Sequence, residues 1–312
     1  MSLRHSPAAL EAALTRVAHD KIAQDNIAHV DIAYVNGEFT PLHEARVFVL
    51  DRGFLFGDGV YEVAAVLDGR LIDNEAHLSR LERSLRELGL SSPLPMARIA
   101  ELQRELLARS GLREGIVYLQ ITRGVAEREF GFPSGATPTL VMFTQEKNIL
   151  ASPAAAAGIA VKTVADIRWA RRDIKSVALL AQVLAKQAAA AAGCQEAWMI
   201  DEAGMVTEGS SSTSFIITRD GAIVTRPNST AILPGCTRRA VVALAEREGL
   251  AIEERAFSIA EALRAAEAFI TSASTFVTPV VSIDGQPIGD GRPGAHTKHL
   301  RELYIAFARG SA

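Results

Sequence analysis

Residues 171–187 read RRDIKSVALLAQVLAKQ, and the lysine at position 175 is the most informative residue of the chain. The chain has only six lysines among its 33 basic residues, so arginine carries most of the positive charge. Lys175 precedes an apolar run of helical spacing over residues 176–192, which Gly193 ends. A lysine at such a strand-to-helix junction, near cations and apolar side chains, has the surroundings that lower an amine pKa and make a nucleophile. The alternative is a solvated turn lysine, and position alone favours that alternative.

The composition is that of an ordinary globular chain of 312 residues, with 48% apolar and 22% charged residues. This length predicts two domains or one large one. A net charge of −3 offers no basic surplus for nucleic acid, and no run of about 18 uncharged apolar residues predicts a membrane span. We therefore expect neither nucleic-acid nor membrane partners. Cys194 and Cys236 match neither a metal-ligand nor a disulfide pattern, which favours a reducing, cytoplasmic location and no metal site.

Hairpins and helices are mixed along the chain, which indicates an α+β fold. Asn-Gly and Asp-Gly pairs predict hairpin turns at 36–37, 68–69 and 284–285. Periodicity predicts helices over 74–88, 96–110, 176–192 and 237–248 and at the C-terminus, and strands over 115–122, 138–144, 159–167, 196–200, 214–218, 251–256 and 267–272. Asn74 is the expected N-cap of the first of these helices. The alanine-rich stretch 148–158 is the predicted linker between domains at 31–147 and 159–312, preceded by an N-terminal extension at 1–30.

Two further features suit a phosphorylated, nitrogen-containing ligand. Residues 235–237 (Gly-Cys-Thr) open a helix whose free N–H groups and positive dipole end are suited to a phosphate, although a simple turn before a surface helix is the commoner case. Glu208 lies in a turn that leads into a strand, where its carboxylate either bonds a protonated ring nitrogen or is exposed. Arg80, Arg83 and Arg86 all lie off the apolar stripe of their helix, and nothing in the pattern singles one out.

Four segments together resemble the fold type IV pyridoxal-phosphate-dependent aminotransferases. They are 51–62 (DRGFLFGDGVYE), 173–187 (DIKSVALLAQVLAKQ), 207–212 (TEGSSS) and 233–238 (LPGCTR). They occur in the family's order, and the likeness extends over about residues 31–305. The lysine segment is similar to that of D-amino-acid transaminases, while branched-chain transaminases and aminodeoxychorismate lyases share the fold. The resemblance implies a homodimer whose subunits have a small N-terminal α/β domain and a larger C-terminal domain with a mostly β, barrel-like core flanked by helices.

The resemblance also implies a role for each candidate residue. Lys175 would form a Schiff base with pyridoxal 5′-phosphate and carry the proton between the substrate α-carbon and cofactor C4′, and Glu208 would keep the ring nitrogen protonated. Arg80 matches the family's phosphate-binding arginine, and Tyr61 and Tyr118 would line the substrate side. The other implied cofactor contacts are Ser211, Ser212, Leu233, Gly235, Cys236, Thr237, Ser272 and Ala273.

Two positions depart from the family's pattern. D-amino-acid transaminases use an Arg-x-His pair of the partner subunit to bind the substrate carboxylate, and here Arg128 is kept while Phe130 replaces the histidine. The missing charge-assisted hydrogen bond would be worth roughly 1.5–3 kcal/mol. Ala273 stands where the family has a phosphate-binding threonine, which leaves a backbone donor there, with Ser272 or Ser274 as possible substitutes.

The sequence therefore predicts a transaminase that moves the amino group of a D-amino acid such as D-alanine to a 2-oxo acid such as 2-oxoglutarate by a ping-pong Schiff-base mechanism. Phe130 leaves a second hypothesis open, an (R)-selective amine transaminase whose substrates lack a carboxylate. Aminodeoxychorismate lyase and a non-catalytic binding protein on the same scaffold are the remaining alternatives.

Overall fold

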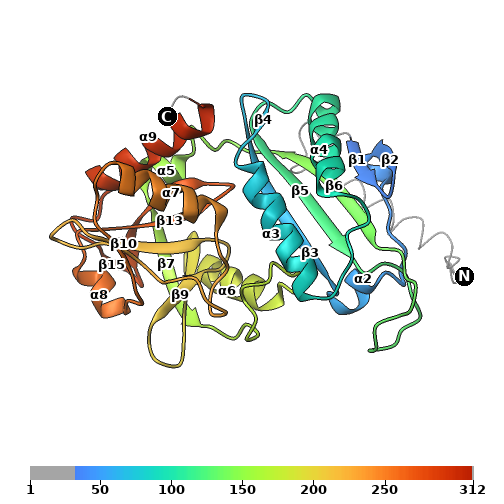
Figure 1. The fold of residues 1–312 in the computed structure, drawn as a ribbon. Coiled ribbons are helices and arrows are strands. Elements are labelled where there is room, and N and C mark those ends of the chain that lie inside the picture. Colours follow the sequence, from blue (N-terminus) through green and yellow to red (C-terminus); the bar gives the residue numbers. More distant parts are fainter. Residues whose placement is uncertain (1–31, 311–312) are drawn as a thin grey trace, which may run out of the picture.

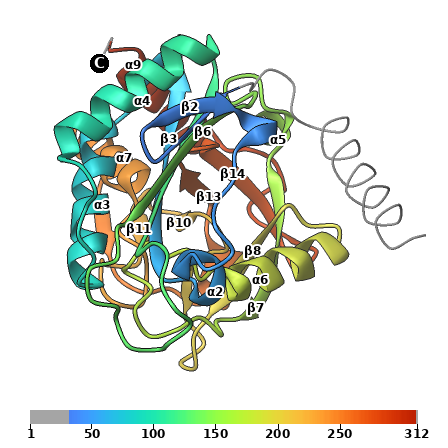
Figure 2. The same ribbon diagram turned by 90° about the vertical axis from the view of Figure 1, so that its right-hand side faces the viewer.

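The computed structural model describes residues 32–310, so the expected N-terminal extension lies outside the described residues. Figure 1 shows two β-sheets in the two halves of the molecule, with helices against each of them, and Figure 2 gives the view turned by 90°. The predicted α+β class and its division into a smaller and a larger part are confirmed. The exact boundaries at 147 and 158 stay a prediction, and a short helix, α5 (Pro153–Ala157), lies inside the predicted linker.

The first sheet has six strands in the order β2-β1-β6-β5-β3-β4, and all neighbouring pairs are antiparallel. Its strands are β1 (Ile32–Val35), β2 (Glu38–Pro41), β3 (Gly59–Leu67), β4 (Arg70–Leu71), β5 (Gly115–Thr122) and β6 (Thr139–Glu146). Helices α3 (Asn74–Glu87) and α4 (Met96–Ser110) cover one face, where Leu81, Ile99 and Leu119 are fully buried. The predicted turns at Asn36 and Asp68 are confirmed by their left-handed φ of 49° and 52°.

The second sheet has nine strands in the order β12-β11-β10-β13-β14-β7-β8-β9, with β15 beside β14. They are β7 (Ile159–Ala165), β8 (Glu196–Ile200), β9 (Val206–Gly209), β10 (Thr213–Ile217), β11 (Ile223–Thr225), β12 (Ile252–Glu254), β13 (Glu267–Ser272), β14 (Phe276–Ile283) and β15 (Gln286–Pro287). Strand β9 ends one side of this order yet runs directly into β10, and Gly209 N donates to Ser212 O at 2.7 Å. This connection curls the sheet, in agreement with the predicted barrel-like core.

The remaining helices lie on the outside of the two sheets or connect them. They are η1 (Leu42–Glu44), α2 (Arg52–Phe56), α6 (Leu180–Ala191), α7 (Cys236–Arg247), α8 (Ile259–Arg264) and α9 (Ala295–Arg309). Ala65 and Leu67 of β3 share a buried cluster with Phe269 and Tyr304, so the two parts pack through a common core. Within residues 32–310, no helix has the length and apolar character needed to cross a bilayer, and no cluster of three or more potential metal ligands occurs.

The helix predicted to start at Ser176 begins four residues later, at Leu180. Its expected first turn is bound to β3 instead, because Tyr61 N donates to Lys175 O at 3.0 Å and Val177 N donates to Gly59 O at 3.1 Å. A contact with a distant strand thus overrides the local helical pattern. Asp73, not Asn74, is the N-cap of α3. The unpredicted elements α2, β9, β11 and α8 are three to six residues long, too short to show a period.

Candidate active site

A cavity between the two sheets gathers most of the residues predicted for the site. The predicted residues that line it are Tyr61, Arg80, Lys175, Glu208, Ser211, Ser212, Leu233, Gly235, Cys236, Thr237, Ser272 and Ala273. Tyr118 lies next to this set, since its ring stacks on that of Tyr61 with centroids 5.7 Å apart. Segments more than 200 residues apart in the chain therefore meet around one space.

The 51–62 signature shapes the strand on which this cavity is built. Asp51 caps α2 by accepting a hydrogen bond from Gly53 N at 2.8 Å. Asp58 then accepts the Nε groups of Arg52 and Arg123, each at 2.8 Å. A side chain at Gly59 would meet Ile121 O at 2.8 Å, so only glycine fits where β3 starts. The signature is thus mainly a structural device that places β3 against the lysine segment.

The amine of Lys175 lies 4.2 Å from the centre of the Tyr61 ring. The side chain is half-buried, and its backbone is fixed on β3 by the hydrogen bond from Tyr61 N. Among the described residues no carboxylate forms an ion pair with this amine. Lys175 is therefore held in the cavity with its nitrogen available for reaction, which argues against a solvated turn lysine.

A buried charge cluster holds Arg80 at the cavity. Its Nε and Nη2 donate to the two oxygens of Glu62, each at 2.8 Å, and Nη1 donates to Pro234 O at 2.9 Å. His77 Nδ1 lies 2.8 Å from Glu62 Oε2. Burial opposes ionisation of Glu62. The charge and hydrogen bonds of Arg80 outweigh this effect and lower the pKa of Glu62 to about 2. Burial likewise opposes the charged form of His77, but hydrogen bonds with Cys236 and Glu62 raise its pKa to about 9. Two cations and one anion leave the cluster with a net positive charge.

The N-terminus of α7 lies beside this cluster. Gly235 is the N-cap, no side chain caps the helix, and Cys236 and Thr237 are its first two residues. The first N–H groups of a helix have no intrahelical acceptor and carry a partial positive charge. A side chain at Gly235 would lie only 2.9 Å from Thr213 Oγ1, so the loop is closely packed. With Arg80 adjacent, this corner of the cavity is suited to a phosphate.

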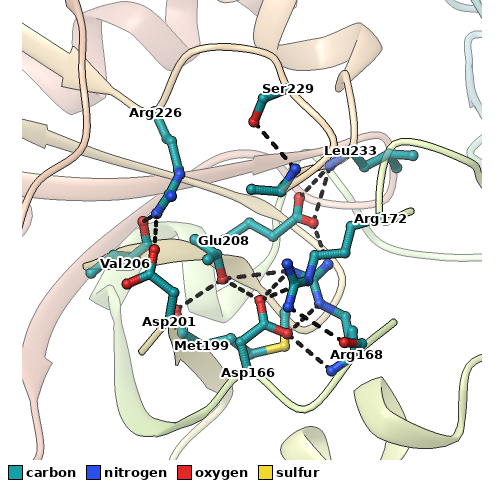
Figure 3. A network of polar contacts seen from close by, with 12 residues as sticks. Asp166, Arg168, Arg172, Met199, Asp201, Val206, Glu208, Arg226, Ser229 and Leu233 are labelled. Atoms are coloured by element: carbon teal, nitrogen blue, oxygen red, sulfur yellow. Dashed lines mark hydrogen bonds and ion pairs between the residues drawn. The ribbon is translucent and has the colours of Figure 1, made fainter. Parts of the chain in front are cut away.

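Glu208 forms a site for a cation rather than for an anion. Figure 3 shows the contacts of its carboxylate. Its carboxylate is buried, pairs with Arg168 Nη1 and accepts Leu233 N at 3.1 and 3.3 Å. The other donors of Arg168, Nε and Nη2, bind Asp166 at 2.9 and 2.7 Å. Burial raises the pKa of Glu208 because one shared guanidinium does not fully compensate its desolvation. A cation placed against this carboxylate would be strongly favoured.

The donor set of the cavity fits pyridoxal 5′-phosphate. Arg80 and the α7 N-terminus suit the phosphate, Glu208 suits a protonated ring nitrogen, and the Lys175 amine suits the aldehyde. The buried hydroxyl of Thr271, which also lines the cavity, has no hydrogen-bond partner among the described residues. Such an unpaired buried group is expected where a polar ligand completes the site.

The family follows from comparison with known proteins. The model of the class IV amino-transferases matches residues 59–283. D-alanine aminotransferase of Staphylococcus aureus (strain MSSA476) is 40% identical over 275 residues, which cover 88% of this chain and 96% of that protein. The chain belongs to the class IV aminotransferases. It is therefore a pyridoxal-phosphate-dependent aminotransferase.

Other relatives agree with this class IV assignment. D-alanine aminotransferase of Bacillus licheniformis is 40% identical over 274 residues, covering 85% of this chain and 93% of that one. A T.th. branched-chain amino acid aminotransferase, solved with pyridoxamine 5′-phosphate, has a TM-score of 0.84 at 27% identity, covering 91% and 95% of the two chains. The Escherichia coli branched-chain enzyme, with a TM-score of 0.86 at 24% identity and coverage of 91% and 96%, shares the fold.

Apart from Tyr118, which stacks on Tyr61 next to the cavity, Arg128 and Phe130 are the predicted site residues that do not line the cavity of their own chain. Both are exposed, and Phe130 keeps 81% of its surface open. Arg128 lies over the rings of Phe56 and Phe130, at 5.5 and 5.9 Å from their centres. A contribution to substrate binding would therefore require a second subunit of this class IV aminotransferase.

Sequence reasoning missed six residues that line the cavity or hold its lining in place. They are Glu62, His77, Asp166, Arg168, Glu196 and Thr271. Glu196 is buried and accepts hydrogen bonds from the hydroxyls of Ser210, Ser211 and Ser212, so it fixes the serine loop. Ser272 Oγ contacts Thr275 Oγ1 at 2.8 Å beside Ala273, and its substitution for the family threonine stays a prediction. The available signal was a charged residue within an otherwise apolar strand, as at Glu62, or at the start of one, as at Glu196.

Proposed function

We propose that this class IV aminotransferase transfers the amino group of a D-amino acid such as D-alanine to a 2-oxo acid such as 2-oxoglutarate in a ping-pong reaction. The observation that carries the proposal is the meeting of three groups in one cavity: the free amine of Lys175, the buried carboxylate of Glu208 and the anion site at Arg80 and α7. The 40% identity to proteins named D-alanine aminotransferase supports the D-amino-acid class.

Each residue has a distinct task in this proposal. Bound pyridoxal phosphate supplies an electron-withdrawing ring that delocalises the charge left when the substrate loses its α-proton. Glu208 stabilises the positive charge on the ring nitrogen, and Arg80 with the α7 N-terminus holds the phosphate. Lys175 Nζ takes and returns the proton at the substrate α-carbon. The Tyr61 ring beside that amine excludes water from one side.

Two groups of exposed apolar side chains support a homodimer. The first group is Val47, Phe48, Val49, Leu50, Phe54, Val125, Phe130 and Phe132, and the second is Ile167, Trp169, Leu180, Val183 and Leu184. Apolar exposure on this scale marks an interaction surface. We propose that a second copy covers this surface and that Arg128 and Phe130 then reach the partner's cavity.

A cytoplasmic location also stays part of the proposal, supported by the free thiols of Cys194 and Cys236.

The test of Lys175 is chemical labelling. Borohydride treatment of the yellow holoenzyme should fix the cofactor on the peptide that contains Lys175, as read by mass spectrometry. The other lysines, such as Lys162 with its ion pair to Asp284, serve as internal controls. A label on a different lysine, or no label, would disprove the assignment.

The test of substrate class is a donor panel of paired D- and L-amino acids and (R)- and (S)-1-phenylethylamine, with 2-oxoglutarate as acceptor. We expect turnover of D-alanine and none of L-alanine. The exposed apolar ring at position 130 favours one second candidate, an (R)-selective amine transaminase. Turnover of the (R)-amine without D-alanine would establish that candidate in place of the proposal.

A further inference from the structure

One face of α3 contacts both the anion site and the lysine segment. Arg80, Arg83, Ser84 and Glu87 are spaced i, i+3, i+4 and i+7, so they share one side of the helix. Arg80 lines the cavity next to α7. The other three contact residues 171–175, which belong to the chain between β7 and α6.

The contacts from this face to the lysine segment are specific. Arg83 Nη1 donates to Asp173 O at 3.0 Å, and Nη2 pairs with the Asp173 carboxylate. Lys175 N lies 3.4 Å from Ser84 Oγ, and Arg171 pairs with Glu87 at 2.6 Å. The Asp173 side chain is only 5% exposed, while Arg83 is 33% exposed. Hydrogen bonds from Arg171 and Arg83 lower the pKa of Asp173, so it stays ionised.

The residue between Asp173 and Lys175 is bound to the same helix. Ile174 is buried in the cluster that contains Leu81 and Leu85 of α3. The segment is thus joined to α3 by two ion pairs, two hydrogen bonds of its backbone and an apolar contact. The hydrogen bonds to Gly59 and Tyr61 of β3 complete this attachment.

We propose that Arg83 and Asp173 are positioning residues that set the distance between the Lys175 amine and the phosphate site. Arg80 and Arg83 lie one turn apart on α3, about 4.5 Å along its axis. The helix therefore fixes two parts of the cofactor site from a single rigid element. Loss of the Arg83–Asp173 pair leaves Arg80 bound to Glu62 but removes the ion pair with α3 that lies nearest in the chain to Lys175.

The two forms of the cofactor separate these effects. With pyridoxal phosphate, the Lys175 amine adds to the aldehyde carbon, a C=N bond forms and one water leaves. Pyridoxamine phosphate carries an amine there and forms no such bond, so its affinity depends on the phosphate and ring contacts alone. This inference rests on the proposed role of Lys175, which the borohydride label tests separately.

The experiment measures the dissociation constants of both cofactor forms for the full-length protein and its variants. We expect Arg83→Met and Asp173→Asn to weaken pyridoxal phosphate binding at least tenfold and to change pyridoxamine phosphate binding less than twofold. Arg83→Lys, which keeps the charge, should recover most of the loss. Arg86→Met is the matched control, since Arg86 lies on the same helix and is exposed. Arg80→Met should weaken both forms.

The outcomes decide between positioning and general support of the fold. Equal weakening of both forms by Arg83→Met, or no weakening of either, would overturn the inference while a label on Lys175 keeps the proposed function. A wild-type protein without the Lys175 label would instead remove the proposed function itself. Chemical denaturation of each variant confirms that the comparison is made on folded protein.

Discussion

Two buried glutamates of the site, Glu62 and Glu208, each pair with an arginine, yet their pKa values shift in opposite directions. The pKa of Glu62 falls to about 2, whereas the pKa of Glu208 is raised. Burial opposes ionisation in both cases. The difference comes from the number of donors that each carboxylate receives.

Glu62 receives both Nε and Nη2 of Arg80 and also contacts His77. Glu208 receives Nη1 of Arg168 and the backbone N–H of Leu233, because Asp166 takes the other two donors of Arg168. The first arrangement is a complete ion cluster with positive charge to spare, suited to a phosphate. The second leaves a carboxylate that lacks a full counter-charge, suited to a protonated ring nitrogen. The same pair of residue types thus builds an anion site and a cation site.

The largest expected effect separates the two glutamates by stability. Glu62→Gln leaves the buried guanidinium of Arg80 without its carboxylate, so we expect the free energy of unfolding to fall by about 3–5 kcal/mol. Glu208→Gln is the matched control, and we expect a loss below about 1 kcal/mol, because Arg168 keeps its ion pair with Asp166 when Glu208 loses its charge. Urea denaturation of both variants without added cofactor measures the difference. Equal losses would contradict the comparison.

The next prediction concerns pH. The pKa of His77 is about 9 in the folded chain against 6.5 for an ordinary histidine, so its contribution to stability is complete below pH 6.5 and disappears as pH rises through 9. The shift corresponds to roughly 3 kcal/mol. His77→Asn should remove this decline between pH 6.5 and 9 in denaturation curves. A decline of the same size in the variant would show that His77 does not cause it.

Local motifs account for what the sequence could predict. Lys175, Glu208 and residues 235–237 each lie in a short segment whose chemistry is visible without the fold, and the structure brings them to one cavity. The resemblance singled out Arg80 among three equivalent arginines, and the contacts explain the choice: Arg80 reaches the cavity, Arg83 binds Asp173, and Arg86 is exposed.

Long-range pairing accounts for what the sequence could not predict. The start of α6 is displaced to Leu180 because residues 175–177 bind β3, which lies more than 110 residues earlier in the chain. Arg168 and Glu208 are 40 residues apart in the chain, and they can pair because β7, β8 and β9 lie side by side in the sheet. Periodicity reports the face of one element, so partners brought together by sheet order stay invisible to it.

A smaller effect tests the cation site through turnover. Glu208→Gln removes the negative charge at the ring nitrogen, and we expect kcat to fall about a hundredfold, which corresponds to one charge-assisted hydrogen bond of roughly 2.7 kcal/mol. Single-turnover absorbance measurements with D-alanine report this step. The affinity for pyridoxamine phosphate should also fall, because one ring contact is lost, but less than in Arg80→Met, because the phosphate contacts are untouched. A variant that loses cofactor but keeps the wild-type rate when saturated would contradict this division of tasks.

The smallest effect tests a single backbone donor of the anion site. Cys236 is the first residue of α7, where proline is tolerated, and Gly235 has φ −68° and ψ 130°, a conformation that can precede proline. Cys236→Pro therefore removes one N–H without breaking the helix, while Cys236→Ala removes the thiol alone. We expect the proline variant to bind both cofactor forms about tenfold more weakly than the alanine variant, since one hydrogen bond to a charged phosphate is lost. Equal affinities of the two variants would show that the α7 N–H does not hold the phosphate, and the anion site would then consist of Arg80 and the hydroxyl groups around it.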